Sequence, residues 1–172
     1  MLNSFVADVL TLSNRRAFFM DCCRPAKGKP EMRTVEWDYE SGRLRMIDQR
    51  LLPAEYKVAA YDDYRDVAHA IRTMVVRGAP AIGATAAFGL ALAARQSPAG
   101  SAQALRGDLK NAAEVLADAR PTAVNLSWAL KRMLAFAAQV EGGAGELRAA
   151  LLEEAQRIAD EDVAINRRMA EY

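Results

Sequence analysis

Four consecutive residues, Arg77-Gly78-Ala79-Pro80, interrupt a stretch that is otherwise apolar on both sides. Glycine adopts a positive φ at little cost, and it commonly follows the last residue of a helix. Proline is well tolerated in the first turn of a helix, where its missing N–H would have no partner. We therefore expect one helix to end at Gly78 and the next to begin at Pro80.

A helix that begins at this point could bind an anion. The amides of Ala79, Ala81 and Ile82 would have no partner within the helix, and the positive end of the helix dipole would lie behind them. Arg77 adds a planar fork of donors that suits phosphate or carboxylate. A plain corner between two helices, with a solvent-exposed arginine, explains the same residues, and the spacing alone favours that simpler interpretation.

A second corner of the same kind occurs at Arg120-Pro121-Thr122, just before Asn125. Thr122 is a good N-cap residue, so capping alone could account for the segment. The alternative is that the two arginine-bearing helix starts contribute to one shared phosphate pocket.

The segment before these corners has the pattern of an antiparallel sheet. Val35 and Trp37 alternate with polar residues, as do Leu44 and Met46, and Ser41-Gly42 between the two runs is typical of a turn. A third short strand is expected over residues 56–60. We predict a small sheet that precedes the helices.

The rest of the chain predicts a bundle of about five helices, which makes the fold class α+β. The first helix begins after Asp62 or Asp63, either of which can cap it, and carries an apolar stripe at Val67, Ile71, Met74 and Val75. The others are expected over residues 81–95, from the cap Ser101 onward, over 123–140 and from about 145 to the end. The last one has an apolar residue every seven positions, at Leu151, Ile158, Ile165 and Tyr172.

Composition narrows the function classes. The 172 residues are 52% hydrophobic and 26% charged with a net charge of +1, and no basic stripe suggests nucleic-acid binding. Residues 79–94 are the longest weakly polar run, shorter than the ~20 residues that span a bilayer. The adjacent Cys22 and Cys23 fit neither a disulfide framework nor zinc-ligand spacing, and His69 is the only histidine. We expect a cytoplasmic protein without a metal site.

Three parts are expected along the chain. Residues 1–31 lack a periodic pattern and end in a Pro/Lys/Gly-rich stretch, so we interpret them as an N-terminal extension and Met32 as the functional start. Residues 32–60 form the β segment and 61–172 the helical bundle, which together make one N-terminal domain.

Three segments carry a resemblance to a known family: TVEWDYESGRLRMIDQRLLP (34–53), IRTMVVRGAPAIGATAAFG (71–89) and RPTAVNLSWAL (120–130). In order and spacing, residues 32–172 resemble the N-terminal part of S-methyl-5-thioribose-1-phosphate isomerases. These enzymes of methionine salvage convert 5-methylthioribose 1-phosphate to 5-methylthioribulose 1-phosphate. Their superfamily includes regulatory subunits of the exchange factor for eukaryotic initiation factor two.

The resemblance implies roles for particular residues. Arg77, Gly78 and Ala79 match the family's substrate-binding triplet, and Arg120 matches its second substrate-contacting arginine. The family needs no metal or nucleotide cofactor, and the full-length protein is expected to be a homodimer. Its catalytic cysteine and aspartate belong to a C-terminal Rossmann-like domain that would begin after INRRMAEY and is missing here. We therefore expect no catalytic residue in this chain, and expect the chain alone to be inactive.

Two alternatives stay open at this stage: a ribose 1,5-bisphosphate isomerase and a non-catalytic regulatory subunit of the initiation-factor-2B type. A hairpin with Trp37, Leu44 and Met46 suits an apolar methylthio tail better than a second phosphate. The presence of this hairpin also favours an enzyme over a regulatory subunit.

The remaining polar and aromatic candidates have plainer interpretations. Asp38 and Asp48 are expected to serve the turn and the solubility of the strand edge, and His69 to lie on the surface or at an interface. The aromatic side chains are expected to belong to the core rather than to stack on a ligand. These are Trp37, Phe88 and Trp128.

Overall fold

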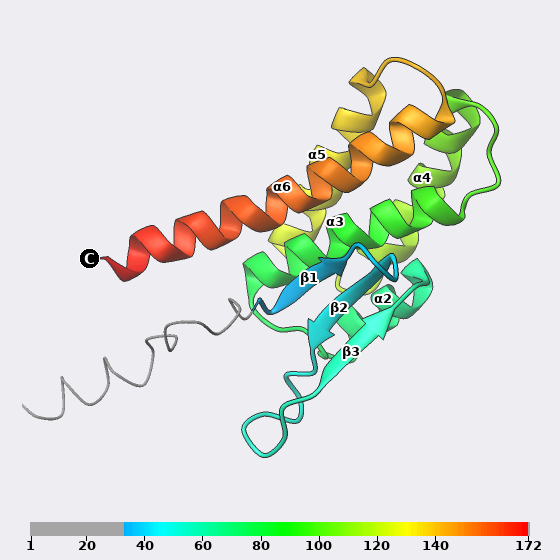
Figure 1. The fold of residues 1–172 in the computed structure, drawn as a ribbon. Helices are drawn as coiled ribbons and strands as arrows, with labels where there is room; N and C mark the ends of the chain where they lie inside the picture. The colour runs from blue at the N-terminus through cyan, green and yellow to red at the C-terminus, as the bar shows by residue number, and fades with distance from the viewer. Residues whose placement is uncertain (1–32, 172) are drawn as a thin grey trace, which may run out of the picture. The chain divides into compact units, whose positions relative to one another are not determined.

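Three short strands pair in the order β1-β2-β3 in the computed structural model, which describes residues 33–171 (Figure 1). The strands are β1 (Val35–Asp38), β2 (Arg43–Ile47) and β3 (Val58–Tyr61), and both pairings are antiparallel. Trp37 lies opposite Leu44 in the register. The predicted small antiparallel sheet is therefore confirmed.

One face of the sheet packs on the helices. The alternating residues Val35, Trp37, Leu44 and Met46 are all buried, and Trp37 stacks on Phe88 with their ring centroids 5.9 Å apart. Trp37 and Phe88 belong to the core, as the sequence predicts. Because the hairpin's apolar side chains are used in this contact, the suggestion that they hold an apolar substrate tail is wrong.

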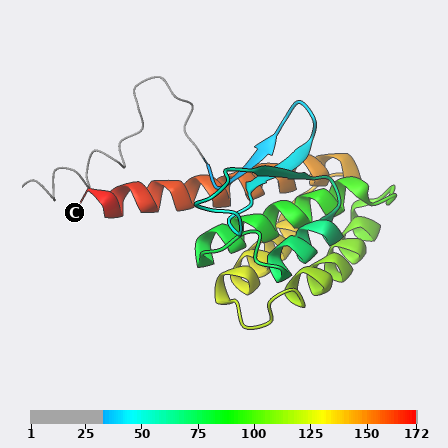
Figure 2. The same ribbon diagram turned by 90° about the horizontal axis from the view of Figure 1, so that it is seen from below.

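Five helices follow the sheet among the described residues, which confirms the α+β class. They are α2 (Tyr64–Arg72), α3 (Ala79–Gln96), α4 (Ala102–Ala117), α5 (Val124–Gln139) and α6 (Ala144–Ala170). Every residue from Ile82 to Ala94 of α3 is buried, and α3 contacts the other four helices and β1. A helix that is apolar all round suits this central position, which both ribbon views show (Figures 1 and 2).

Two of the expected helix caps are present. The side chain of Asp63 accepts a hydrogen bond from the Arg65 amide over 2.7 Å, and Ser101 accepts one from the Ala104 amide over 3.2 Å. The expected cap at Thr122 is wrong, because α5 begins after Ala123 and has no side-chain cap.

The first helix ends earlier than predicted. α2 stops at Arg72, because Met74 adopts a φ of 60°, which breaks the helical run before Gly78. Met74 is 42% exposed and so does not belong to the apolar stripe, although Val75 is buried. Gly78 serves instead as the N-cap of α3.

The last helix is buried over its first half and exposed over its second. Leu151 and Ile158 are buried as predicted, whereas Ile165 is 47% exposed. The final turns of α6 extend beyond the other helices (Figure 2). No helix within residues 33–171 is long and apolar enough to cross a membrane. Residues 1–32, with Cys22 and Cys23, and Tyr172 lie outside the described part, so the expectations about them are not addressed.

Candidate functional site

The link between α2 and α3 has a buried half and an exposed half. Val75 and Val76 are 3% and 0% exposed, and the Val75 amide donates a hydrogen bond to the Ala70 carbonyl oxygen over 3.0 Å. Arg77 and Gly78, the next two residues, are exposed. The two valines thus anchor the link in the core and present Arg77 at the surface.

The start of α3 has the features of an anion-binding helix terminus. Gly78 has a φ of 90°, and a Cβ added to it would meet no atom within 4 Å, so glycine is needed here for backbone conformation rather than for space. Pro80 lies in the first turn, as predicted. The amides of Ala79 and Ala81 have no acceptor among residues 33–171. The Ile82 amide was expected to be free as well, but it donates to the Gly78 carbonyl over 3.0 Å.

Arg77 is fixed through its backbone and not through its side chain. Its amide donates to the Gln49 carboxamide oxygen over 2.9 Å, and the Gln49 amide donates to the Val75 carbonyl over 2.9 Å. The Arg77 guanidinium makes no hydrogen bond or ion pair within the described part of the chain. A fork of donors with no protein acceptor, next to two unpaired amides, can hold a phosphate or carboxylate.

Asp48, the residue before Gln49, is 7% exposed, so its expected role at a solvated strand edge is wrong. One carboxylate oxygen accepts from the Arg50 amide at 3.1 Å and from its Nε at 2.9 Å, and the other accepts from its Nη2 at 2.6 Å. The hydrogen bonds from Arg50 hold the pKa of Asp48 below its ordinary value. Asp38, by contrast, accepts from Ser41 in the β1–β2 turn, as predicted.

The second corner lies beside the first because α3 and α5 approach closely. A Cβ on Gly83 would lie 3.1 Å from the Asn125 carbonyl oxygen. Arg120 is half-buried, its carbonyl accepts from the Ala123 amide over 3.0 Å, and its guanidinium has no partner in the described residues. The fold therefore brings together the starts of the two helices that the sequence singled out.

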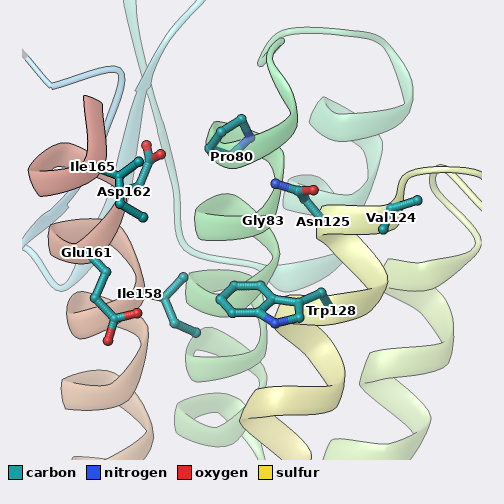
Figure 3. Close-up of a pocket in the computed structure, with 9 residues that line it drawn as sticks. All are labelled: Pro80, Gly83, Val124, Asn125, Trp128, Ile158, Glu161, Asp162 and Ile165. Atoms are coloured by element: carbon teal, nitrogen blue, oxygen red, sulfur yellow. The ribbon is translucent and has the colours of Figure 1, made fainter. Parts of the chain in front are cut away.

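A pocket of about 370 Å³ lies between α3, α5 and α6 at this end of the bundle (Figure 3). It is lined by Pro80, Gly83, Val124, Asn125, Trp128, Ile158, Glu161, Asp162 and Ile165. None of the four predicted site residues is among them. Arg77, Gly78 and Ala79 precede Pro80 directly, however, and Arg120 lies four positions before Val124.

The expectation that Trp128 belongs to the core is wrong. This residue is 50% exposed rather than part of the core, and its ring extends from α5 toward Ile158 of α6 (Figure 3). The Arg132 guanidinium lies over the ring, 5.4 Å from its centroid. Trp128 thus offers the pocket a large apolar surface that is still open to solvent.

The acidic side of the pocket is held by an ion-pair network. Arg132 donates to Glu161 over 2.5 and 2.9 Å and to the buried Glu154 over 2.7 Å, and Arg157 donates to Glu154 over 2.6 Å. Hydrogen bonding to Arg132 lowers the pKa of Glu161, so this carboxylate is ionised at neutral pH. No group of three or more His, Cys, Asp or Glu in residues 33–171 could hold a metal ion.

Residues 75–172, which include both corners and all of α6, match the model of the initiation factor 2 subunit family. The chain belongs to this family. Within it, the chain is a homologue of methylthioribose-1-phosphate isomerases, as the resemblance of the three segments predicts.

The isomerase relatives are longer than this chain. It is 52% identical over 136 residues to the methylthioribose-1-phosphate isomerase of Syntrophotalea carbinolica, a match that covers 78% of this chain and 40% of that protein. The enzyme of Desulforudis audaxviator is 53% identical over 131 residues, covering 76% and 37%. The chain spans about 40% of the length of the curated relatives it matches.

Solved structures of the family share the fold. The crystal structure of 5-methylthioribose 1-phosphate isomerase from Pyrococcus horikoshii matches with a TM-score of 0.76 at 46% identity, over 81% of this chain and 39% of that one. Subunit delta of the translation initiation factor eIF-2B from A. fulgidus matches with a TM-score of 0.71 at 40% identity, over 77% and 38%.

Gln49, the partner of the Arg77 amide, was not predicted from the sequence. Nothing local distinguishes a glutamine that bonds a backbone amide 28 residues away from one that faces solvent. A signal was present at Asp48 and Arg50, where an acid and a base two positions apart beside a predicted strand can form a clamp. The only histidine, His69, is exposed, as predicted.

Proposed function

We propose that this chain is the N-terminal, substrate-binding part of an isomerase that converts 5-methylthioribose 1-phosphate to 5-methylthioribulose 1-phosphate. The observation that carries the proposal is the meeting of two arginine-bearing helix starts, at Arg77 and Arg120, beside one pocket. Over about three quarters of the chain, about half of the aligned residues are identical to those of proteins named for this activity.

The substrate's phosphate or ring oxygens would bind at the first corner. The Arg77 guanidinium and the amides of Ala79 and Ala81 are donors without protein acceptors in the described residues, and they lie at the positive end of the α3 dipole. Gly78 adopts the φ of 90° with which the backbone turns into α3 at this corner. Arg120 would contribute a second positive charge from the start of α5.

The pocket favours an apolar substituent over a second phosphate. Pro80, Val124, Trp128, Ile158 and Ile165 give it apolar walls on all three helices. Asp162 places a carboxylate without an ion pair among the described residues on the α6 side, where a phosphate would meet like charge, whereas Glu161 is already paired with Arg132. This supports methylthioribose 1-phosphate as the substrate rather than ribose 1,5-bisphosphate.

The reaction requires an open sugar chain. The C1–O4 bond of the furanose breaks and O4 gains a proton, while hydrogen moves from C2 to C1 and the C2 hydroxyl loses its proton to become the ketone. Substrate and product are isomers, so no other reactant is consumed. We assign this chain the binding and orientation of the phosphosugar, and we place no proton-transferring residue within it.

A regulatory subunit is the second candidate, because subunit delta of eIF-2B from A. fulgidus has a similar fold. A protein that works only through contacts with other proteins has no need for unpaired donors at a pocket. Phosphosugar binding therefore separates the two candidates.

Titration of the ¹⁵N-labelled chain with methylthioribose 1-phosphate tests the proposal. We expect saturable amide shifts at Gly78, Ala79 and Asn125, and weaker binding of ribose 1,5-bisphosphate. Ribose without phosphate serves as the control and should cause none of these shifts. If neither methylthioribose 1-phosphate nor ribose 1,5-bisphosphate binds, the proposal is overturned.

A further inference from the structure

Gln49 holds the Arg77 corner from outside its own segment. It follows β2, and two hydrogen bonds join it to the link between α2 and α3. Its amide donates to the Val75 carbonyl and its carboxamide oxygen accepts from the Arg77 amide, each over 2.9 Å. The two bonds flank Val76, so they fix the backbone immediately before Gly78.

The link needs such a partner because its backbone is unusual. Met74 and Gly78 have φ values of 60° and 90°, both in the left-handed region that most residues avoid. On the α2 side, the Val75 amide is held by the Ala70 carbonyl. The Arg77 amide has Gln49 as its acceptor and no other among the described residues. Without Gln49, Arg77, the first residue of the exposed corner, would lose its backbone hydrogen bond.

Gln49 is itself held on a braced turn. The neighbouring Asp48 is bonded through both carboxylate oxygens to Arg50, its amide donates to the Lys57 carbonyl over 2.8 Å, and its carbonyl accepts from the Leu51 amide over 3.2 Å. Because these contacts fix the backbone on either side of Gln49, its carboxamide presents the oxygen to Arg77 at little further entropic cost.

We propose that Gln49 is a positioning residue for the phosphosugar site: it holds the backbone of Arg77 so that the guanidinium and the α3 amides converge on one anion. The inference rests on the proposed function. It adds a residue from the sheet layer to a site otherwise formed by helix starts, and assigns that residue no contact with substrate.

Two variants and one control test this role. Gln49→Met keeps the length of the side chain but removes the acceptor, whereas Gln49→Glu keeps an acceptor oxygen. Gln96→Met is the matched control, because Gln96 also makes a side-chain bond to backbone, to the Asp62 carbonyl over 3.0 Å, at the other end of α3. Each variant is compared by the hydrogen-exchange rate of the Arg77 amide, by affinity for methylthioribose 1-phosphate and by thermal melting.

We expect Gln49→Met to speed Arg77 exchange and weaken binding about five- to tenfold, the effect of one hydrogen bond, while its Tm stays within a few degrees of that of the wild type. Gln49→Glu should keep the slow exchange, and Gln96→Met should keep both exchange and affinity. Unchanged exchange and affinity in Gln49→Met would overturn the inference, as would equal losses in Gln96→Met. If the wild type binds no phosphosugar, the proposed function fails, and faster Arg77 exchange in Gln49→Met would still support the holding role.

Discussion

Gly83 of α3 and Asn125 of α5 approach so closely that a Cβ on Gly83 would lie 3.1 Å from the Asn125 carbonyl oxygen. A backbone oxygen cannot rotate away as a side chain can, so a larger residue at position 83 would have to separate the two helices. Both residues line the pocket of the candidate site, together with Pro80 and Val124 of the same two helices. A small residue in a buried helix thus lets α3 and α5 approach closely beside the candidate site.

Arg77 provides the first prediction. Arg77→Ala should weaken binding of methylthioribose 1-phosphate by at least tenfold, since a charge-assisted hydrogen bond is worth about 1.5–3 kcal/mol. Its Tm should barely change, because the side chain is exposed and has no protein partner in the described residues. Arg77→Lys keeps the charge but loses the fork, so it should restore only part of the affinity. Calorimetric titration and thermal melting measure the two effects.

The matched control for Arg77 is Arg72→Ala. Arg72 is also exposed and has no partner in the described part of the chain, but it belongs to the last turn of α2. The Arg72→Ala variant should bind methylthioribose 1-phosphate with the affinity of the wild type. Equal losses in both variants would mean that net charge, and not the corner, attracts the ligand.

Replacing glycine with alanine should change the stability in opposite directions at Gly78 and at Gly107. Gly78→Ala should destabilise the fold by about 1–2 kcal/mol, because a φ of 90° is strained for any L side chain even though the added Cβ has space. Gly107→Ala, at an exposed and equally open position within α4, should stabilise it by about 0.5–1 kcal/mol. Urea unfolding of both variants tests the contrast, and a stabilising Gly78→Ala would contradict the assigned conformation.

Periodic patterns made most of the fold predictable. The alternation around Trp37 and the spacing of Leu105, Leu109 and Leu116 depend on the two periods of strand and helix, which are local properties. The errors at Met74 and Thr122 have one cause. Both residues fit a helix or its cap by type, but the backbone φ that excludes Met74 and the N-cap position taken by Ala123 are decided by tertiary packing.

The candidate site was predictable only in part for a related reason. Arg77 and Gly78 could be selected as candidates from the sequence, because a glycine, a proline and an arginine together interrupt an apolar run. Gln49 and Trp128 carry no such mark. The role of Gln49 depends on the turn after β2 lying close to the link between α2 and α3. The exposure of Trp128 depends on how much of α5 is covered by α6. Neither property is determined by the residues that are nearby in the sequence.

Asp48 predicts how stability depends on pH. Its pKa is held below its ordinary value of 3.8 by hydrogen bonds from Arg50, so the unfolded chain binds a proton more readily than the folded one. Its contribution is complete above that value and is lost as the pH falls through the lowered folded pKa. Asp48→Asn should therefore be less stable at neutral pH, and its stability should fall less steeply as the pH falls below the ordinary carboxyl value of 3.8.

The measurement for Asp48 is the free energy of unfolding in urea at a series of pH values. Asp118→Asn, at the exposed C-cap of α4 and without an ion pair in the described residues, is the control and should follow the wild-type curve. Parallel curves for Asp48→Asn and the wild type would show that the Arg50 clamp does not act on stability through this carboxylate.

The Trp128 ring should determine the preference of the pocket for a substrate with a methylthio group. Its ring is half exposed and lines the cavity beside Ile158, so the apolar methylthio group would lose contact area in Trp128→Ala. Because a few buried carbon atoms in a pocket are worth about 1–3 kcal/mol, the preference for methylthioribose 1-phosphate over ribose 1-phosphate should fall at least fivefold. Affinity for ribose 1-phosphate should change little, since the donors at Arg77 are untouched. Tyr39→Ala, which removes another exposed aromatic residue in the β1–β2 turn, should keep the wild-type preference. An equal loss of affinity for both sugars in Trp128→Ala would mean that the ring supports the corner and does not contact the methylthio group.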